Sequence, residues 1–215
     1  MTQIAPSMLS CDFSRMGEAA LAMEKAGADC LHLDVMDGMF VTNMSFGMPI
    51  ISSLRPVTDL PFDVHLMIVE PERYIERFID AGADWVTVHL EACADVSVAL
   101  DTIRLRGKRA GLSVKPGTPA EAVYPYLEQC DFILVMTVEP GYGGQALIPE
   151  MLSKIREIRA EIERRGLSTQ IQADGGINLE NAADVRAAGA DILVAGSSVF
   201  KAKDPALAIA TLRGE

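Results

Sequence analysis

A histidine and an aspartate two positions apart, His32 and Asp34, carry the most specific chemical signal in the sequence. They lie in a stretch that begins as an apolar strand and ends in an acidic, glycine-containing turn, and alternation along a strand puts both side chains on one face. A second histidine, His65, and a second aspartate, Asp174, stand near the ends of later apolar runs. Two imidazoles and two carboxylates suit zinc, ferrous iron, manganese or cobalt, so we expect one divalent metal ion among them.

Glycine-rich turns indicate a second kind of site, for a phosphate group. Gly141-Tyr142-Gly143-Gly144 would expose backbone amides on a flap, and Gly175-Gly176 and Gly196-Ser197 each follow a predicted strand. Backbone amides and helix N-termini bind phosphate without any charged side chain. One glycine pair is explained by the ordinary needs of turns, but two such turns after consecutive late strands predict a phosphate site.

Eight short apolar runs, each followed by a helical pattern, must position these residues. The predicted strands cover residues 4–8, 31–35, 63–67, 85–89, 110–114, 132–136, 170–173 and 192–195. The predicted helices cover 12–26, 48–54, 71–81, 96–106, a short stretch from Pro119, 150–165, 179–188 and 205–212. This alternation shows no break in composition, so it predicts one α/β domain over residues 1–215, built on a parallel sheet.

The tetrapeptide Ala-Gly-Ala-Asp occurs three times, at 26–29, 81–84 and 188–191. The first two copies are 55 residues apart, and the next interval of 107 is close to twice that. A repeating unit of two strand–helix pairs fits a closed (β/α)8 barrel, the TIM barrel, which we predict. A doubly wound open sheet is the rival, but no GxGxxG motif follows the first strand. The tetrapeptide itself is interpreted as a structural helix C-cap.

Catalytic side chains of such a barrel lie at the C-terminal ends of its strands. All three histidines, His32, His65 and His89, fall there. A polar cluster that merely fills the barrel mouth is the competing interpretation, and His89 is left open as a ligand, a partner of a ligand or a packing residue. Methionines near the strand ends predict either core filling or a dry, polarizable lining over a charged intermediate: Met8, Met36, Met67 and Met136.

Composition limits the kinds of molecule and the compartment that we expect for this protein. The net charge is −11, with 30 acidic and 19 basic residues, which argues against nucleic acid and against an anionic membrane surface. The four cysteines form no CxxC pair, which suits a reducing compartment. No apolar run approaches 18 residues and no signal-peptide pattern opens the chain, so we expect a cytoplasmic protein with a small-molecule substrate.

The chain resembles the ribulose-phosphate 3-epimerase family over nearly its whole length. The resemblance rests on long, correctly ordered stretches: 4–10, 32–38, 45–47, 63–67, 138–145 and 174–178. It implies an isomerase that interconverts D-ribulose 5-phosphate and D-xylulose 5-phosphate. It also implies a homo-oligomer, as is common among such epimerases.

The resemblance further implies a role for each candidate residue. Metal-ligand positions fall on His32, Asp34, His65 and Asp174, and the acid and base positions on Asp34 and Asp174. Substrate-binding positions fall on Ser7, His65, Gly141, Tyr142, Gly143, Gly144, Asp174, Gly175, Gly176, Gly196 and Ser197. The chemistry agrees with this, because carboxylates on opposite sides of a barrel serve opposite faces of a carbon, and a divalent cation would stabilise an enediolate.

Two positions depart from the family pattern. Thr42 replaces a proline in the turn after the second strand, which puts the order of that loop in doubt. Gln172 stands where glutamate is common, which removes a negative charge close to Asp174. Asp37, beside Gly38, is interpreted as a turn former without a catalytic role.

Three other functions stay open. A sister 3-epimerase acting on D-allulose 6-phosphate would use the same acids and differ only in pocket size. A metal-free barrel that makes indole or imidazole precursors should need a lysine at a strand end, and Lys115 is the only strong candidate. A non-catalytic sugar-phosphate binder would not need paired acids on the second and seventh strands.

Overall fold

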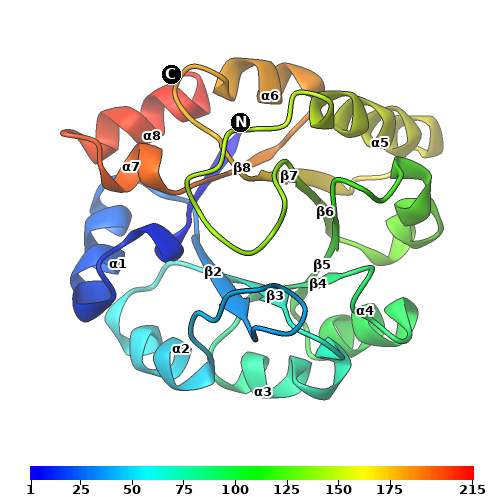
Figure 1. Cartoon of the computed structure of the whole chain (residues 1–215), viewed down its shortest axis with the longest axis horizontal. Helices are drawn as coiled ribbons and strands as arrows, with labels where there is room; N and C mark the ends of the chain where they lie inside the picture. The colour runs from blue at the N-terminus through cyan, green and yellow to red at the C-terminus, as the bar shows by residue number, and fades with distance from the viewer.

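In the computed structural model, which describes all 215 residues, eight parallel strands form a ring surrounded by helices (Figure 1). The hydrogen-bonded order β1-β8-β7-β6-β5-β4-β3-β2 follows the sequence around the ring. A single parallel bridge between Ser7 and His32 joins β1 to β2. The strands are β1 Gln3–Pro6, β2 Leu31–Met36, β3 Phe62–Met67, β4 Trp85–His89, β5 Arg109–Val114, β6 Phe132–Met136, β7 Gln170–Asp174 and β8 Ile192–Ala195. The single-domain (β/α)8 barrel is confirmed.

The helices pack around the outside of this ring. They are α1 Met16–Lys25, α2 Met48–Leu54, α3 Ile75–Asp80, α4 Val96–Leu105, α5 Met151–Arg165, α6 Ala182–Ala188, α7 Ser197–Phe200 and α8 Pro205–Arg213. After β5 a ten-residue 3-10 segment, η5 Ala120–Gln129, takes the place of an α-helix. Pro125 inside this segment explains the substitution, because proline lacks the amide hydrogen that an α-helical bond would need.

Aliphatic side chains fill the space between the strands and the helices, in one cluster of 50 buried residues. Inside the ring, the end where the strands begin is closed by the aromatic rings of Trp85 and Phe132. The Arg109 guanidinium lies 4.1 Å from the Trp85 ring centroid and donates to Gln170 Oε1 at 2.6 Å. This apolar plug leaves the opposite end of the barrel for the polar side chains.

The repeated tetrapeptide has a structural role at the end of the barrel where the strands begin. Its glycines adopt the left-handed conformation just after α1, α3 and α6, as a helix C-cap requires. Its aspartates, Asp29, Asp84 and Asp191, each precede an even-numbered strand and accept a backbone N–H bond from the odd-numbered strand before it, at 2.7, 3.0 and 2.8 Å. The repeat therefore follows the pairing of strands around the barrel.

Several element ends differ from the prediction. The first strand ends at Pro6 because Met8–Ser10 forms a 3-10 turn, and the first helix begins only at Met16, after a 3-10 turn whose N-cap is Asp12. The helix predicted at 71–81 is divided into a 3-10 turn and α3, and the one predicted at 179–188 begins at Ala182. The four-residue helix α7 was not predicted.

No helix combines the length and apolar character needed to span a membrane.

Candidate metal and catalytic site

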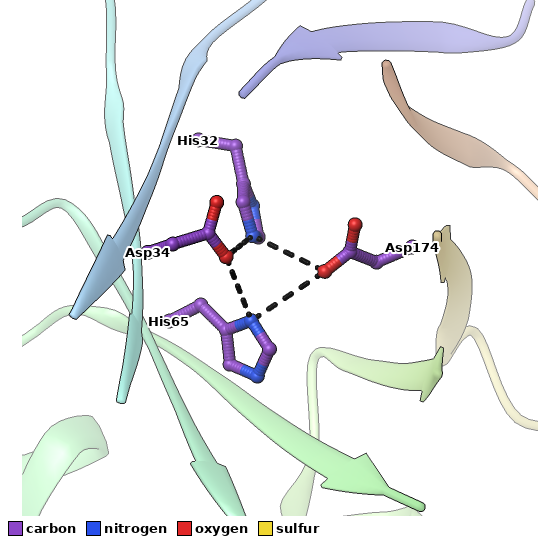
Figure 2. A group of neighbouring side chains, drawn as sticks. All are labelled: His32, Asp34, His65 and Asp174. Atoms are coloured by element: carbon purple, nitrogen blue, oxygen red, sulfur yellow. Dashed lines mark ion pairs between the residues drawn. The ribbon is translucent and has the colours of Figure 1, made fainter. Parts of the chain in front are cut away.

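The register of β2 and β3 brings three of the four predicted ligands together. Asp34 pairs with His65 in this register, and His32 lies two residues earlier on the same face of β2. Asp174 ends β7 on the far side of the barrel and points back toward them. Figure 2 shows the four side chains converging from β2, β3 and β7 on one point. The prediction that His32 and Asp34 share one face of their strand agrees with this arrangement.

The four side chains form a closed ring of short contacts. His32 Nε2 lies 3.3 Å from Asp34 Oδ1 and 3.6 Å from Asp174 Oδ2. His65 Nδ1 lies 3.4 Å from Asp34 Oδ1 and 3.6 Å from Asp174 Oδ2. All four donor atoms lie within 4.8 Å of one another. Ligand atoms that bind zinc tetrahedrally at about 2.1 Å lie about 3.4 Å apart, so these spacings suit one small divalent ion.

The two imidazole nitrogens that face this point have no hydrogen-bond partner. His32 Nε2 and His65 Nδ1 are both fully buried and unsatisfied, which is costly unless another group binds them. Burial opposes protonation of His32, but the carboxylates of Asp34 and Asp63 raise its pKa well above the ordinary value. Burial also opposes ionisation of Asp34, yet the two imidazoles hold its pKa well below the ordinary range. The cluster attracts positive charge, and a divalent cation would supply it.

Asp63, which the sequence analysis did not select, orients His32 from behind. Its Oδ2 lies 2.7 Å from His32 Nδ1 and accepts a second hydrogen bond from Gln172 Nε2 at 2.6 Å. A hydrogen bond from Nδ1–H to this carboxylate leaves the Nε2 lone pair facing the cluster. The signal was present in the sequence, because Asp63 lies two residues before His65 on the same strand face. The role of Gln172, which the sequence analysis noted only as a departure from a pattern, is to donate its side-chain amide hydrogen to the Asp63 carboxylate.

His89 is placed beside His65, so the three interpretations left open for it can now be separated. Its Nε2 lies 2.9 Å from His65 Nε2, and its Nδ1 lies 3.3 Å from Glu91 Oε2. His89 is not among the four residues whose donor atoms converge. It is therefore a hydrogen-bonding partner of a candidate ligand. Burial lowers the pKa of His89 to about 4, so its ring is neutral at pH 7.

A cavity of about 250 Å³ opens directly above Asp34 and Asp174. Its wall contains nearly all the predicted substrate-binding residues: Ser7, Gly141, Tyr142, Gly143, Gly144, Asp174, Gly175, Gly176, Gly196 and Ser197. His65 is fully buried and does not line the cavity. Ser7 donates a hydrogen bond to Asp34 Oδ2 at 2.6 Å, which orients this carboxylate. The glycine turns and the two carboxylates thus face the same space.

Two loops meet over this cavity. The loop between β6 and α5, yellow-green in Figure 1, crosses in front of the barrel mouth. A Cβ atom on Gly176 would lie 2.3 Å from the backbone nitrogen of Leu147, so glycine is required where the β7 loop touches this crossing loop. The φ angle of 69° at Gly176 independently favours glycine.

The loop after β2 is ordered by Asp37, in agreement with the structural role predicted for it. The Asp37 carboxylate accepts amide hydrogen bonds from Met39 and Phe40 and a third, at 2.8 Å, from Val69 in the next loop. Val41 packs against buried methionines at the ends of β2 and β3. The loop is therefore anchored even though Thr42 lacks the fixed backbone angle of a proline.

Three of the four methionines singled out in the sequence, Met36, Met67 and Met136, line the cavity, whereas Met8 is buried in the main core. Met36, Met67 and Met136 keep no more than 5% of their surface exposed. The cavity floor is therefore apolar around two carboxylates. Such a lining excludes water and strengthens electrostatic interactions inside.

Solved structures with the same architecture include a 3-hexulose-6-phosphate synthase, with a TM-score of 0.69 at 19% identity, covering 99% of this chain and 98% of that one. Orotidine 5'-phosphate decarboxylase from Pyrococcus horikoshii aligns with a TM-score of 0.70 at 17% identity, covering 99% of this chain and 100% of that one. At these identities the likeness shows the fold alone.

Sequence relatives are much closer. Ribulose-phosphate 3-epimerase from Synechocystis is 50% identical over 212 residues, which is 98% of this chain and 92% of the relative. The enzyme of the same name from Bacillus subtilis is 46% identical over 215 residues, covering 100% of this chain and 99% of the relative. The model of the ribulose-phosphate 3 epimerase family matches residues 3–200. With the site described above, these matches show that the chain is an isomerase of the ribulose-phosphate 3-epimerase family.

Proposed function

We propose that this protein catalyses metal-dependent epimerisation at C3, interconverting D-ribulose 5-phosphate and D-xylulose 5-phosphate. One observation carries the proposal: Asp34 on β2 and Asp174 on β7 face each other across the floor of one cavity. Inversion of a carbon next to a ketone needs a base on one face and an acid on the other. The names of the relatives identify the sugar phosphate on which such a pair would act.

The proton transfers are assigned to the two carboxylates. In one direction Asp34 or Asp174 accepts the C3 proton as a base, and the opposite residue donates a proton to the other face of the enediolate. In the reverse direction the two residues exchange these roles. Ser7, through its hydrogen bond to Asp34 Oδ2, keeps that carboxylate turned toward the cavity.

The metal-ligand set proposed is His32, Asp34, His65 and Asp174, on the basis of the two unsatisfied imidazole nitrogens and the spacing of the donor atoms. One divalent ion, Zn²⁺, Fe²⁺, Mn²⁺ or Co²⁺, would supply Lewis-acid stabilisation of the negative charge on the enediolate oxygens. The apolar methionines keep water away from the same region.

Backbone amides of the glycine turns are proposed to hold the phosphate end of the substrate. Gly176 and Gly196-Ser197 line one side of the cavity, and Gly143 and Gly144 on the crossing loop line another. Ser197 is the first residue of α7. A phosphate bound there would place the sugar chain toward Asp34 and Asp174.

An assay of the purified protein with both sugar phosphates tests the proposal. We expect turnover of D-ribulose 5-phosphate to exceed that of D-allulose 6-phosphate, to disappear on chelation and to return when a divalent ion is restored. Preference for the six-carbon substrate would establish the sister activity instead. Absence of epimerisation by the metal-loaded protein would refute the proposal.

The metal-free class of barrel is not favoured by the position of Lys115. Its Nζ lies 3.7 Å from the Phe40 ring centroid, and Lys115 is not among the residues that line the cavity. A purely binding role is disfavoured because two carboxylates at the cavity floor would repel a phosphorylated ligand, and a binding protein has no need of an acid–base pair. Retention of full activity after chelation would reopen the metal-free class.

The proposed setting is a cytoplasmic homo-oligomer. The four unpaired cysteines support a reducing compartment such as the cytoplasm, and a relative from Arabidopsis thaliana is described as chloroplastic. Exposed apolar side chains on the loop after β2, Met39 and Met44, support self-association. Light scattering of the purified protein should give the mass of two or more chains of 23.2 kDa each. A mass equal to one chain would refute the oligomer.

A further inference from the structure

We propose that Glu91, acting through His89, fixes the tautomer of His65 so that its Nδ1 lone pair faces the metal. Glu91 and His89 would then be positioning residues for the ligand, not catalytic residues. This inference rests on the metal site of the proposed function. Neither residue lines the cavity, and neither is among the four converging ligands.

The hydrogen-bonded series from Glu91 through His89 to His65 begins at a carboxylate in a defined environment. Glu91 Oε1 accepts hydrogen bonds from the Lys115 backbone amide at 2.8 Å and from the Thr118 hydroxyl at 2.5 Å. The other oxygen, Oε2, faces His89 Nδ1 at 3.3 Å. An ionised carboxylate can only accept hydrogen bonds, so His89 Nδ1 must carry the hydrogen.

The position of the ring hydrogen on His89 determines the position of the ring hydrogen on His65. A neutral His89 with its hydrogen on Nδ1 presents a lone pair on Nε2. The ring planes of His65 and His89 are only 24° apart and the two Nε2 atoms are 2.9 Å apart, so His65 Nε2–H can donate to that lone pair. The hydrogen of neutral His65 is then on Nε2, and its Nδ1 is left unprotonated.

The unprotonated nitrogen points where a metal needs it. His65 Nδ1 is buried, has no hydrogen-bond partner and lies 3.4 Å from Asp34 Oδ1 and 3.6 Å from Asp174 Oδ2. The opposite tautomer would direct an N–H group at the ion. His32 achieves the same result directly, through Asp63, whereas His65 does so through one additional imidazole.

Packing holds the intermediate ring in place. The Phe40 ring centroid lies 4.8 Å from the His89 ring centroid, and the Lys115 ammonium lies 3.7 Å from the Phe40 centroid. His89 has no exposed surface. A fixed and dry ring is needed if a change at Glu91 is to be transmitted to His65.

The substitution Glu91→Gln tests the inference because it keeps the shape of the side chain but introduces an N–H donor. The amide can donate to His89 Nδ1, which reverses the hydrogen bond between the two rings and moves the hydrogen of His65 to Nδ1. The Glu91 side chain is 20% exposed, so the substitution is compatible with folding. We expect Zn²⁺ affinity, measured by competition with a chromophoric chelator, to fall by about 10- to 100-fold.

Nitrogen-detected NMR gives a readout that does not depend on activity. The chain has only three histidines, so their ring nitrogens can be assigned individually. In metal-free protein, at a pH high enough that the ring-nitrogen shifts of His65 no longer change with pH, His65 should have its hydrogen on Nε2 in the parent protein. In the Glu91→Gln variant it should shift toward Nδ1. Thr118→Val removes one hydrogen bond from Glu91 but keeps the carboxylate as an acceptor, so the hydrogen of His65 should stay on Nε2 in this variant.

Glu72→Gln is the matched control. Glu72 also supports the loop after β4, through hydrogen bonds that its Oε1 accepts from the amides of Ala94 and Asp95 at 2.6 and 3.2 Å. It has no imidazole partner, so the tautomer and the Zn²⁺ affinity should stay as in the parent. An unchanged His65 tautomer and Zn²⁺ affinity in Glu91→Gln would overturn the inference. If the parent protein binds no metal or does not epimerise, the proposed function fails independently of the tautomer result.

Discussion

Asp174 combines two proposed tasks at one side chain, metal ligand and proton carrier, and Asn in its place separates them. The amide keeps an oxygen that can face the ion but cannot exchange a proton at neutral pH. We expect Asp174→Asn to retain sugar-phosphate binding and to lose about 10²- to 10⁴-fold in turnover. Steady-state kinetics and a binding isotherm measure the two separately. Asp184→Asn, at an exposed position of α6, is the control, and near-normal turnover by the Asp174 variant would refute the role.

His89 makes stability depend on pH in a predictable direction. Its pKa falls from 6.5 to about 4 on burial, so between these values the unfolded chain binds a proton that the folded chain does not. The free energy of unfolding attributable to His89 should therefore decrease as the pH is lowered from about 6.5 to 4, by roughly 3 kcal/mol in total. Urea unfolding of metal-free protein over this range measures it.

The comparison with His89→Gln isolates this contribution. His32 and His65, whose pKa values are raised, act in the opposite direction, but they are present in both proteins. The variant should lose less stability than the parent as the pH falls. Equal pH dependence in the two proteins would show that His89 is not held neutral by the fold.

At the residue scale, the sequence predicted the converging side chains better than their supports. Alternation along a strand was enough to put His32 and Asp34 on one face, and the same rule could have selected Asp63. The contact between His65 and His89 depends on rotamers and on the stagger between β3 and β4, which no spacing within either strand encodes.

At the scale of elements, the contact between the β7 loop and the crossing loop after β6 has no room for an added methyl group at Gly176. Gly176→Ala would place a Cβ atom against the backbone of Leu147, and its φ of 69° is unfavourable for alanine. We expect KM for the sugar phosphate to rise on the order of tenfold, since losing a single hydrogen bond to a charged group has an effect of this size. Steady-state kinetics measure KM.

Gly117→Ala is the matched control for this loop substitution. A Cβ atom there meets nothing within 4 Å, and the residue lies outside the site. Its KM should equal that of the parent. Parent-like kinetics for Gly176→Ala would show that the two loops do not hold the phosphate end.

The helical elements were predicted less accurately than the strands. Buried strands appear as continuous apolar runs, and each predicted strand range overlaps the strand that the structure has there. Short 3-10 turns before α1 and α3 and the helix α7 escaped prediction because one turn of helix carries too little periodicity to be seen. The 3-10 segment η5 shows how Pro125 overrides an otherwise helical pattern.

At the scale of the whole molecule, a bound ion would connect β2 and β3 to β7 across the barrel. A ligand that binds only the folded state raises the free energy of unfolding by about 2.7 kcal/mol when its concentration is 100 times Kd. We therefore expect the melting temperature to fall on chelation and to recover with added Zn²⁺. The His65→Ala variant, which lacks one ligand, should show a smaller difference. A melting temperature indifferent to chelation would contradict the metal site.

The barrel itself was predictable because its regularity extends over the entire chain. Eight alternations of strand and helix, and the spacing of the Ala-Gly-Ala-Asp copies, specify a closed ring more strongly than any local motif does. The bridge between Ser7 and His32 that joins β1 to β2 could not be predicted, because it depends on how the ring closes in space.

Hydrogen exchange at C3 of the substrate in D₂O tests the central claim most directly, that two carboxylates act on opposite faces of one carbon. Proton NMR would follow deuterium incorporation into D-ribulose 5-phosphate and D-xylulose 5-phosphate with the parent protein, Asp34→Asn and Asp174→Asn. The account predicts that the parent exchanges both sugars, and that each variant is blocked in epimerisation but exchanges C3 of one sugar only, a different sugar for each variant. Exchange of both sugars by either variant, or epimerisation by both variants at the parent's rate, would contradict it.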